Sequence, residues 1–168
     1  MTPGTVPLPE PFGSALGAGE PARVVDSEAA TPEALFARAC ARSLVGRRAE
    51  ARADLLNAAP ALGDPCRIEL ALLAIQARED VEEALTTARE IAGRADAAPA
   101  LRARALHVLG LAEARLRRSD SARAHLLAAA RLYRELRDRL GCARVFDTLG
   151  MLEAAIGRLD HALPFYAL

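Results

Sequence analysis

Three histidines, His107, His125 and His161, are the side chains in this sequence best suited to bind a metal or transfer a proton near neutral pH. No two of them have the i, i+4 spacing that would let one helix face hold a metal ion. Each histidine is therefore interpreted as a structural or a solvated residue. We expect neither a metal site nor any other cofactor.

The cysteines and the clustered acidic residues do not indicate a catalytic site either. Cys40, Cys66 and Cys142 are far apart, form no Cys-x-x-Cys pair and are expected to fill small packing positions on helices. The acidic stretch 79–83 is typical of the beginning of a helix, where negative charge is favourable. The sequence contains no glycine-rich phosphate loop and no nucleophile elbow. We therefore predict that the protein is not an enzyme.

Charge and hydropathy exclude further classes of function. The 22 basic residues, all of them arginine, balance 22 acidic residues, so the net charge predicts binding to neither nucleic acid nor an acidic membrane. Residues 101–168 alone carry a net charge of +5, from twelve arginines and seven acids. No run of about 18 apolar residues is present that could span a membrane. The N-terminus has neither basic residues nor an apolar stretch, so we do not expect it to be a secretory signal. We predict a cytoplasmic protein.

The sequence divides into a tail and a helical region. Residues 1–30 are rich in Pro and Gly, which predicts a disordered N-terminal tail. Order is predicted to begin at Thr31, a good N-cap, followed by Pro32 at the first helical position and Glu33 in the first turn. From there helices alternate with short turns and no strand pattern occurs, which predicts an all-α domain over 31–168.

An alanine recurs near the beginning of every second predicted helix. The spacings between these alanines are 33, 38 and 40 residues, for Ala51, Ala84, Ala122 and Ala162. A small residue is needed at this position because the two helices of one hairpin cross there at close approach. Recurrence at this period is typical of a solenoid of helical hairpins.

The residues around this alanine resemble the tetratricopeptide repeat. The fourth copy shows Leu149-Gly150 in the first helix, Gly157 at the turn, Ala162 in the second helix and Tyr166 four residues later. The other copies share parts of the motif: Leu106, Leu109, Gly110, Ala122, Leu126 and Ala129 in the third, Leu35, Gly46, Ala51, Leu55 and Ala58 in the first, and Ile68, Ala84 and Ile91 in the second. The resemblance implies a right-handed α-solenoid of about four antiparallel hairpins over residues 32–168.

Two segments are interpreted through this resemblance. Residues 132–141 look like the longer connecting helix of the roughly 40-residue variety of the repeat, which occurs in bacterial signalling proteins. The last helix is predicted to begin near Leu159, with Pro164 in its first turn. So short a helix would be marginal, so we expect an incomplete fourth repeat.

The resemblance also implies a binding groove, because the first helix of each hairpin lines a concave surface in this family. Its groove positions correspond here to Glu69, Leu73, Gln76, Arg104, His107, Leu111, Arg115, Arg144, Asp147 and Met151. Arg104 and Arg144 are 40 residues apart at the same repeat position, so we expect their guanidinium groups to stand side by side and hold a carboxylate. The three apolar positions favour a partly apolar peptide with an acidic element.

The sequence therefore predicts a protein-interaction module that binds a partner peptide or helix in this groove. One alternative is a regulatory or sensor segment of a larger bacterial signalling protein, attached to a cyclase, kinase or transcription-regulator output domain. Another is a homo-oligomer formed through the incomplete C-terminal hairpin.

Overall fold

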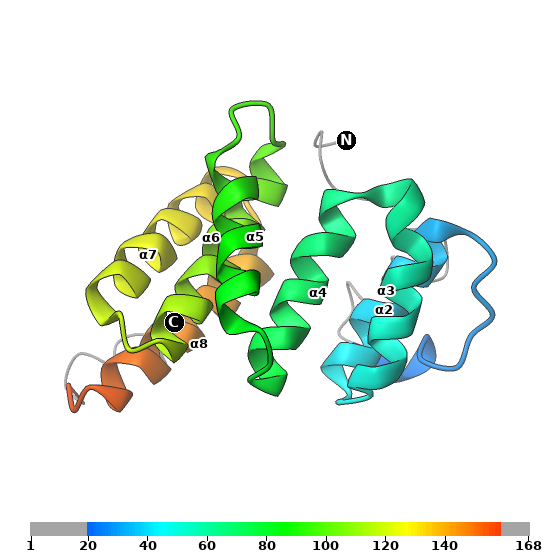
Figure 1. The fold of residues 1–168 in the computed structure, drawn as a ribbon, viewed down its shortest axis with the longest axis horizontal. Helices are drawn as coiled ribbons and strands as arrows, with labels where there is room; N and C mark the ends of the chain where they lie inside the picture. The colour runs from blue at the N-terminus through cyan, green and yellow to red at the C-terminus, as the bar shows by residue number, and fades with distance from the viewer. Residues whose placement is uncertain (1–19, 159–168) are drawn as a thin grey trace. The chain divides into compact units, whose positions relative to one another are not determined.

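The computed structural model describes residues 20–158, in which seven α-helices follow one short 3-10 helix (Figure 1). These elements are η1 (Pro21–Arg23), α2 (Pro32–Leu44), α3 (Arg48–Leu62), α4 (Asp64–Ala77), α5 (Val81–Gly93), α6 (Pro99–Arg115), α7 (Ser119–Glu135) and α8 (Arg139–Ala155). No strand occurs within the described range, and the predicted all-α class is confirmed. Residues 1–19 and the predicted last helix near Leu159 lie outside this range.

The chain divides into two compact units between Ala77 and Arg78. In the N-terminal unit, described over residues 20–77, α3 packs against α2 and α4. In the C-terminal unit, described over residues 78–158, α6 packs against α5 and α7, and α8 packs against α7 and α6. The helices predicted for one domain over 31–168 are thus divided between two units, and the second predicted hairpin has one helix in each.

The sequence of this second hairpin differs from the others at the helix-crossing position. The third copy has Gly110 there and the first copy has Ala39, twelve residues before the recurring alanine in each case, whereas the second copy has Leu72. A hairpin needs a small residue where its helices approach closely, because a branched side chain holds the backbones apart. The second copy therefore lacks a packing feature that the first and third copies have.

The beginning of α2 agrees with the prediction made from the sequence. The Thr31 hydroxyl accepts a hydrogen bond from the Ala34 backbone N–H at 3.2 Å, and Pro32 is the first helical residue. This side chain satisfies one of the backbone donors that every helix N-terminus leaves open. The predicted N-cap is therefore confirmed.

The segment before Thr31 is ordered from residue 20, so the predicted disordered tail is wrong for residues 20–30. Val24 and Val25 are buried against Ala34, Ala37 and Ala41 of α2. Two guanidinium groups hold the backbone of the segment, with Arg38 Nη1 donating to the Ser27 carbonyl at 2.8 Å and Arg42 Nε donating to the Val25 carbonyl at 2.9 Å. Composition alone did not predict this order, because it depends on arginines of the following helix.

The connecting helix predicted over residues 132–141 is also wrong, because α7 ends at Glu135 and α8 begins at Arg139. Arg137 adopts a φ of 58°, and the Asp138 N–H donates to the Tyr133 carbonyl, which closes the C-terminus of α7. The Asp138 carboxylate then accepts from the Gly141 N–H at 2.8 Å and caps α8. The C-terminal turn of α7 and the N-cap of α8 therefore divide into two helices a segment whose sequence is typical of one.

The recurring alanine of the third copy, Ala122, lies at the close contact of its hairpin, as predicted. Ala51, Ala84 and Ala122 are all buried. A Cβ added to Gly110 of α6 would lie 2.7 Å from Leu126 Cγ and 3.1 Å from the Ala122 carbonyl oxygen, both on α7. The glycine therefore permits α6 and α7 to cross at this point.

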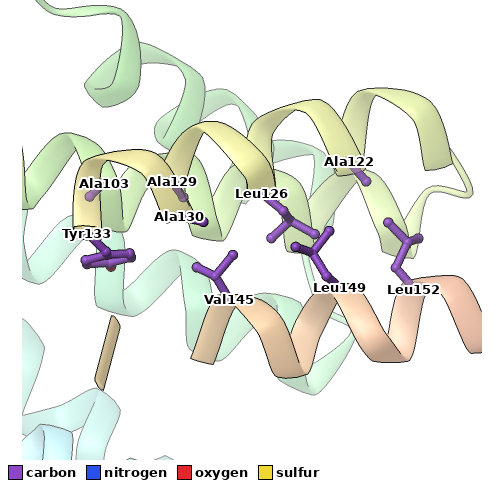
Figure 2. Packing of buried hydrophobic residues seen from close by; sticks show 9 residues of the cluster. All are labelled: Ala103, Ala122, Leu126, Ala129, Ala130, Tyr133, Val145, Leu149 and Leu152. Atoms are coloured by element: carbon purple, nitrogen blue, oxygen red, sulfur yellow. The ribbon is translucent and has the colours of Figure 1, made fainter. Parts of the chain in front are cut away.

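Each unit has an apolar core built from small and branched residues. In the N-terminal unit, one cluster joins α2, α3 and α4 through Ala39, Ala51, Leu55, Ala58, Cys66 and Leu73. In the C-terminal unit, Val145 and Leu149 of α8 point toward Leu126 of α7 (Figure 2). Tyr133 closes one end of this second cluster and is also buried. These cores fix the side of α6 and α8 that stays exposed.

Candidate interaction surface

Seven of the ten predicted groove residues lie on α6 and α8 of the C-terminal unit. Three of them are exposed, namely Arg115, Asp147 and Met151, and the Met151 side chain keeps 50% of its surface accessible. Arg104, Leu111 and Arg144 are half-buried, and His107 is buried. Six of these positions, all but the buried His107, therefore present a mixed surface of apolar, basic and acidic side chains on two packed helices. We call this surface the α6–α8 face and define it by these six residues.

The other three predicted groove residues lie on α4 in the N-terminal unit. Leu73 belongs to the core of that unit and is only 5% exposed, so its prediction as a groove residue is wrong. It packs with Leu55 and Cys66 because α4 turns this side toward α3. Gln76 is exposed and Glu69 is half-buried. Because they belong to a separate unit, the surface considered below is the α6–α8 face alone.

His107 is buried between helices and does not line an open groove, which corrects its predicted role. Its side chain is only 4% exposed, and its Nε2 lies 3.0 Å from the hydroxyl oxygen of Thr148 on α8. The residue at the same repeat position in α8 is Asp147, which is exposed. His107 is buried because α8 covers it. His107 therefore joins α6 to α8.

The hydrogen bonds of Thr148 determine which nitrogen of His107 carries the proton. The Thr148 hydroxyl donates to the Arg144 carbonyl at 2.9 Å, so it must accept from His107 Nε2–H. Nδ1 is then an acceptor, and this buried atom has no hydrogen-bond partner within the described part of the chain. Burial, followed by the positive charges of Arg104 and Arg144, lowers the pKa of His107 to about 3. His107 is therefore neutral at physiological pH.

This arrangement predicts that the protein loses stability in mild acid. The unfolded chain takes up a proton near pH 6.5 that the folded chain resists down to about pH 3, so stability falls as the pH drops between these values. We expect the part due to His107 to be about 2 kcal/mol between pH 7 and pH 5, measured by urea denaturation. A His107→Gln variant should lose this part of the pH dependence, whereas His125→Gln should keep it. Equal pH dependence in wild type and His107→Gln would contradict the assignment.

Arg104 and Arg144 both lie close enough to His107 for their charge to act on its pKa. One belongs to α6 and the other to α8, and these two helices are in contact. The two guanidinium groups are thus near the same buried ring, on the half-buried edge of the α6–α8 face. That they stand side by side and hold one carboxylate stays a prediction.

Two buried glutamates that the sequence analysis missed occupy one repeat position, 40 residues apart. Glu113 of α6 accepts a hydrogen bond from His125 Nδ1 of α7 at 2.7 Å. Glu153 of α8 accepts two from Arg123 of α7, at 2.7 and 2.8 Å. Both glutamates are at most 4% exposed. The recurrence of an acid on an otherwise apolar helix side was the signal that could have revealed them, and their role is to hold α7 between α6 and α8.

The structure also bears on cysteine reactivity, metal binding and membrane-spanning helices. Cys66 is buried, and burial raises the pKa of its thiol to about 11, so the thiol stays protonated and unreactive at neutral pH. Over residues 20–158, no three His, Cys, Asp or Glu side chains gather in a way that could hold a metal ion. Within the same range, none of the helices combines the length and apolar character needed to cross a membrane.

The chain is similar in fold to a solved helical structure. That structure, titled "MamA RS-1 ArsTM double mutant", is 17% identical in sequence and aligns over 93% of this chain and 86% of its own, with a TM-score of 0.53. MamA is a tetratricopeptide-like helical protein, so the likeness supports a helical repeat array. No protein-family model matches the chain, and no curated protein matches it in sequence.

Proposed function

We propose that this protein is a non-enzymatic protein-interaction module of the tetratricopeptide type, and that it binds a partner peptide or helix on the α6–α8 face. The observation that carries the proposal is the accessible side chain of Met151, which lies on the same face as two half-buried arginines. A helical repeat array supports this function, because such arrays expose an extended surface formed by successive helices.

The composition of the face favours a partner with both apolar and acidic residues. Met151 and Leu111 occupy the same repeat position on α8 and α6 and offer apolar contact area to the partner. Methionine at a binding surface adapts to different shapes because its side chain is unbranched and polarisable. Arg104 and Arg144 are seven residues before these two positions, about two helical turns away. A partner would therefore place its apolar side chains near Met151 and a carboxylate near the arginines.

Charge reversal tests the basic part of this face. We expect Arg104→Glu with Arg144→Glu to weaken binding of an acidic, partly apolar partner peptide by about tenfold or more, since attraction becomes repulsion. The partner is first captured with the full chain as bait, and the affinity of its peptide is then measured by fluorescence anisotropy. Arg48→Glu with Arg52→Glu, two exposed residues of α3, is the matched control. Unchanged affinity in the first variant would remove Arg104 and Arg144 from the binding surface.

A second variant covers the case in which the double charge reversal does not fold. Met151→Glu places a charge on an exposed side chain and should leave the helices intact, yet it should weaken the same peptide. Leu56→Glu on α3 is its control, because Leu56 is 48% exposed, close to the 50% of Met151. If both substitutions weaken the peptide equally, the α6–α8 face is not the binding surface.

A further inference from the structure

The turn between α7 and α8 carries a cluster of arginines that the groove does not include. Arg131 and Arg134 are on the last turns of α7, Arg137 is in the turn itself, and Arg139 is the first residue of α8. All four are exposed, and none forms an ion pair with a residue in the described range. We call these four residues the basic rim.

Three other arginines of the same unit lie close to acids of neighbouring helices. Arg123 pairs with Glu153 of α8, Arg118 pairs with Glu82 of α5, and Arg89 lies 3.9 Å from Glu113. These pairs join neighbouring helices. In the basic rim, by contrast, four guanidinium groups within nine residues are directed to solvent, although like charges so close together repel one another. An anionic partner would remove this repulsion.

The acidic residues within the stretch 131–139 do not neutralise the positive charge of the basic rim. The Asp138 carboxylate is used to cap α8, where it accepts a hydrogen bond from the Gly141 N–H. Glu135 is the other acid, and it too forms no ion pair with a described residue. The stretch 131–139 therefore keeps a net charge of +2, with acids placed between the arginines.

These details favour a protein partner over a nucleic acid. A single-stranded nucleic acid needs exposed aromatic rings on which its bases stack, but the aromatic residue of this stretch, Tyr133, is only 6% exposed. Leu140, which directly follows the rim, is 54% exposed and provides the apolar contact that protein interfaces use beside arginine.

We propose that the basic rim, with Leu140 beside it, is a second docking surface that binds an acidic segment of a partner protein containing Glu, Asp and leucine-like residues. The guanidinium groups would donate paired hydrogen bonds to carboxylates of the partner, and Leu140 would contact an apolar side chain between them. This surface lies at the α7–α8 turn and does not depend on binding at the α6–α8 face.

The test measures binding of the full chain to a fluorescein-labelled peptide composed of Glu, Asp and Leu, by fluorescence anisotropy at about 50 mM salt, where screening is weak. We expect the variant R131Q/R134Q/R137Q/R139Q to lose about tenfold or more in affinity. The matched control is R48Q/R52Q/R117Q/R158Q, which removes four exposed arginines that likewise have no ion-pair partner among the described residues. It should lose less than about threefold, because it changes only the overall charge. Both sets contain one arginine with positive φ, Arg137 and Arg117.

Several outcomes would overturn the proposal. One is that the wild-type chain fails to bind the acidic peptide, or binds its Gln, Asn and Leu counterpart equally well. Another is that the rim variant and the matched control lose the same affinity, which would mean that net charge alone acts. Tighter binding to a labelled DNA duplex or to phosphatidylserine vesicles, lost in the rim variant, would assign the rim to a different class of partner. If circular dichroism shows that the fourfold variant is unfolded, R134Q/R139Q replaces it, with an expected loss of about threefold.

Discussion

Replacing Asp54 with Asn is expected to lower the free energy of unfolding of the N-terminal unit by about 3 kcal/mol. The carboxylate is only 5% exposed and accepts hydrogen bonds from two arginines of α2. Arg38 binds it through Nε at 2.9 Å and Nη2 at 2.8 Å, and Arg42 binds it through Nη1 at 2.8 Å. Without the negative charge, the largely buried Arg38 would have no carboxylate partner among the described residues, and Arg42 would keep only Glu50, at 3.6 Å. Leaving a buried charge without its partner is the costly way to break a buried ion pair.

The same substitution should release the segment that precedes α2. Asp54 orients Arg38 and Arg42, and these two side chains hold the carbonyls of Ser27 and Val25. Loss of the carboxylate would therefore loosen residues 24–28 as well as the contact between α2 and α3. Urea denaturation gives the change in stability, and amide hydrogen exchange reports on the segment.

The control for Asp54→Asn is Glu50→Gln on the same helix. Glu50 pairs with Arg47, and both side chains are more than a third exposed, while its distance to Arg42 is a longer 3.6 Å. We therefore expect a much smaller loss of stability than for Asp54→Asn. The two variants remove the same charge from α3. If they destabilise equally, or if exchange in residues 24–28 is unchanged in Asp54→Asn, the role assigned to this carboxylate is wrong.

A second large effect is expected for Gly141→Ala near the beginning of α8. The added Cβ would lie 2.5 Å from Cε1 and 2.6 Å from Cγ of the Tyr133 ring. Both distances are too short for carbon atoms that are not bonded to each other. Tyr133 is packed in the core of the C-terminal unit, so relief requires the ring or α8 to shift. We expect a loss of about 2 kcal/mol from this overpacking, although alanine is favoured over glycine within helices by about 1 kcal/mol.

Gly93→Ala supplies the matched control, because a Cβ at Gly93 meets no atom within 4 Å. It should be neutral or stabilise the protein by up to about 1 kcal/mol, as expected for alanine at a helical position. Combining Gly141→Ala with Tyr133→Leu should cost less than the sum of the two single changes, since the smaller side chain makes room. Full additivity of the two changes, measured by urea denaturation, would contradict the steric explanation.

Local signals in the sequence predicted much of the fold. Thr31 and Pro32 fixed the beginning of α2, because capping depends on residues within one turn of each other. The recurring alanine Ala122 marked the close contact of its hairpin, since a helix crossing excludes large side chains at any such point. The 40-residue period also placed Arg104 and Arg144 on two helices that are in contact.

The sequence by itself thus determined the all-α class, the beginning of α2 and the small residues at helix crossings, all of which follow from short-range geometry. Only the tertiary structure decided which polar side chains meet. It buried His107 under α8 while leaving Asp147, at the same repeat position, exposed. It also ordered residues 20–30 through Arg38 and Arg42, and divided the helices into two units after Ala77. Such outcomes depend on which helix covers a given side chain, and periodicity within one helix carries no information about its neighbours.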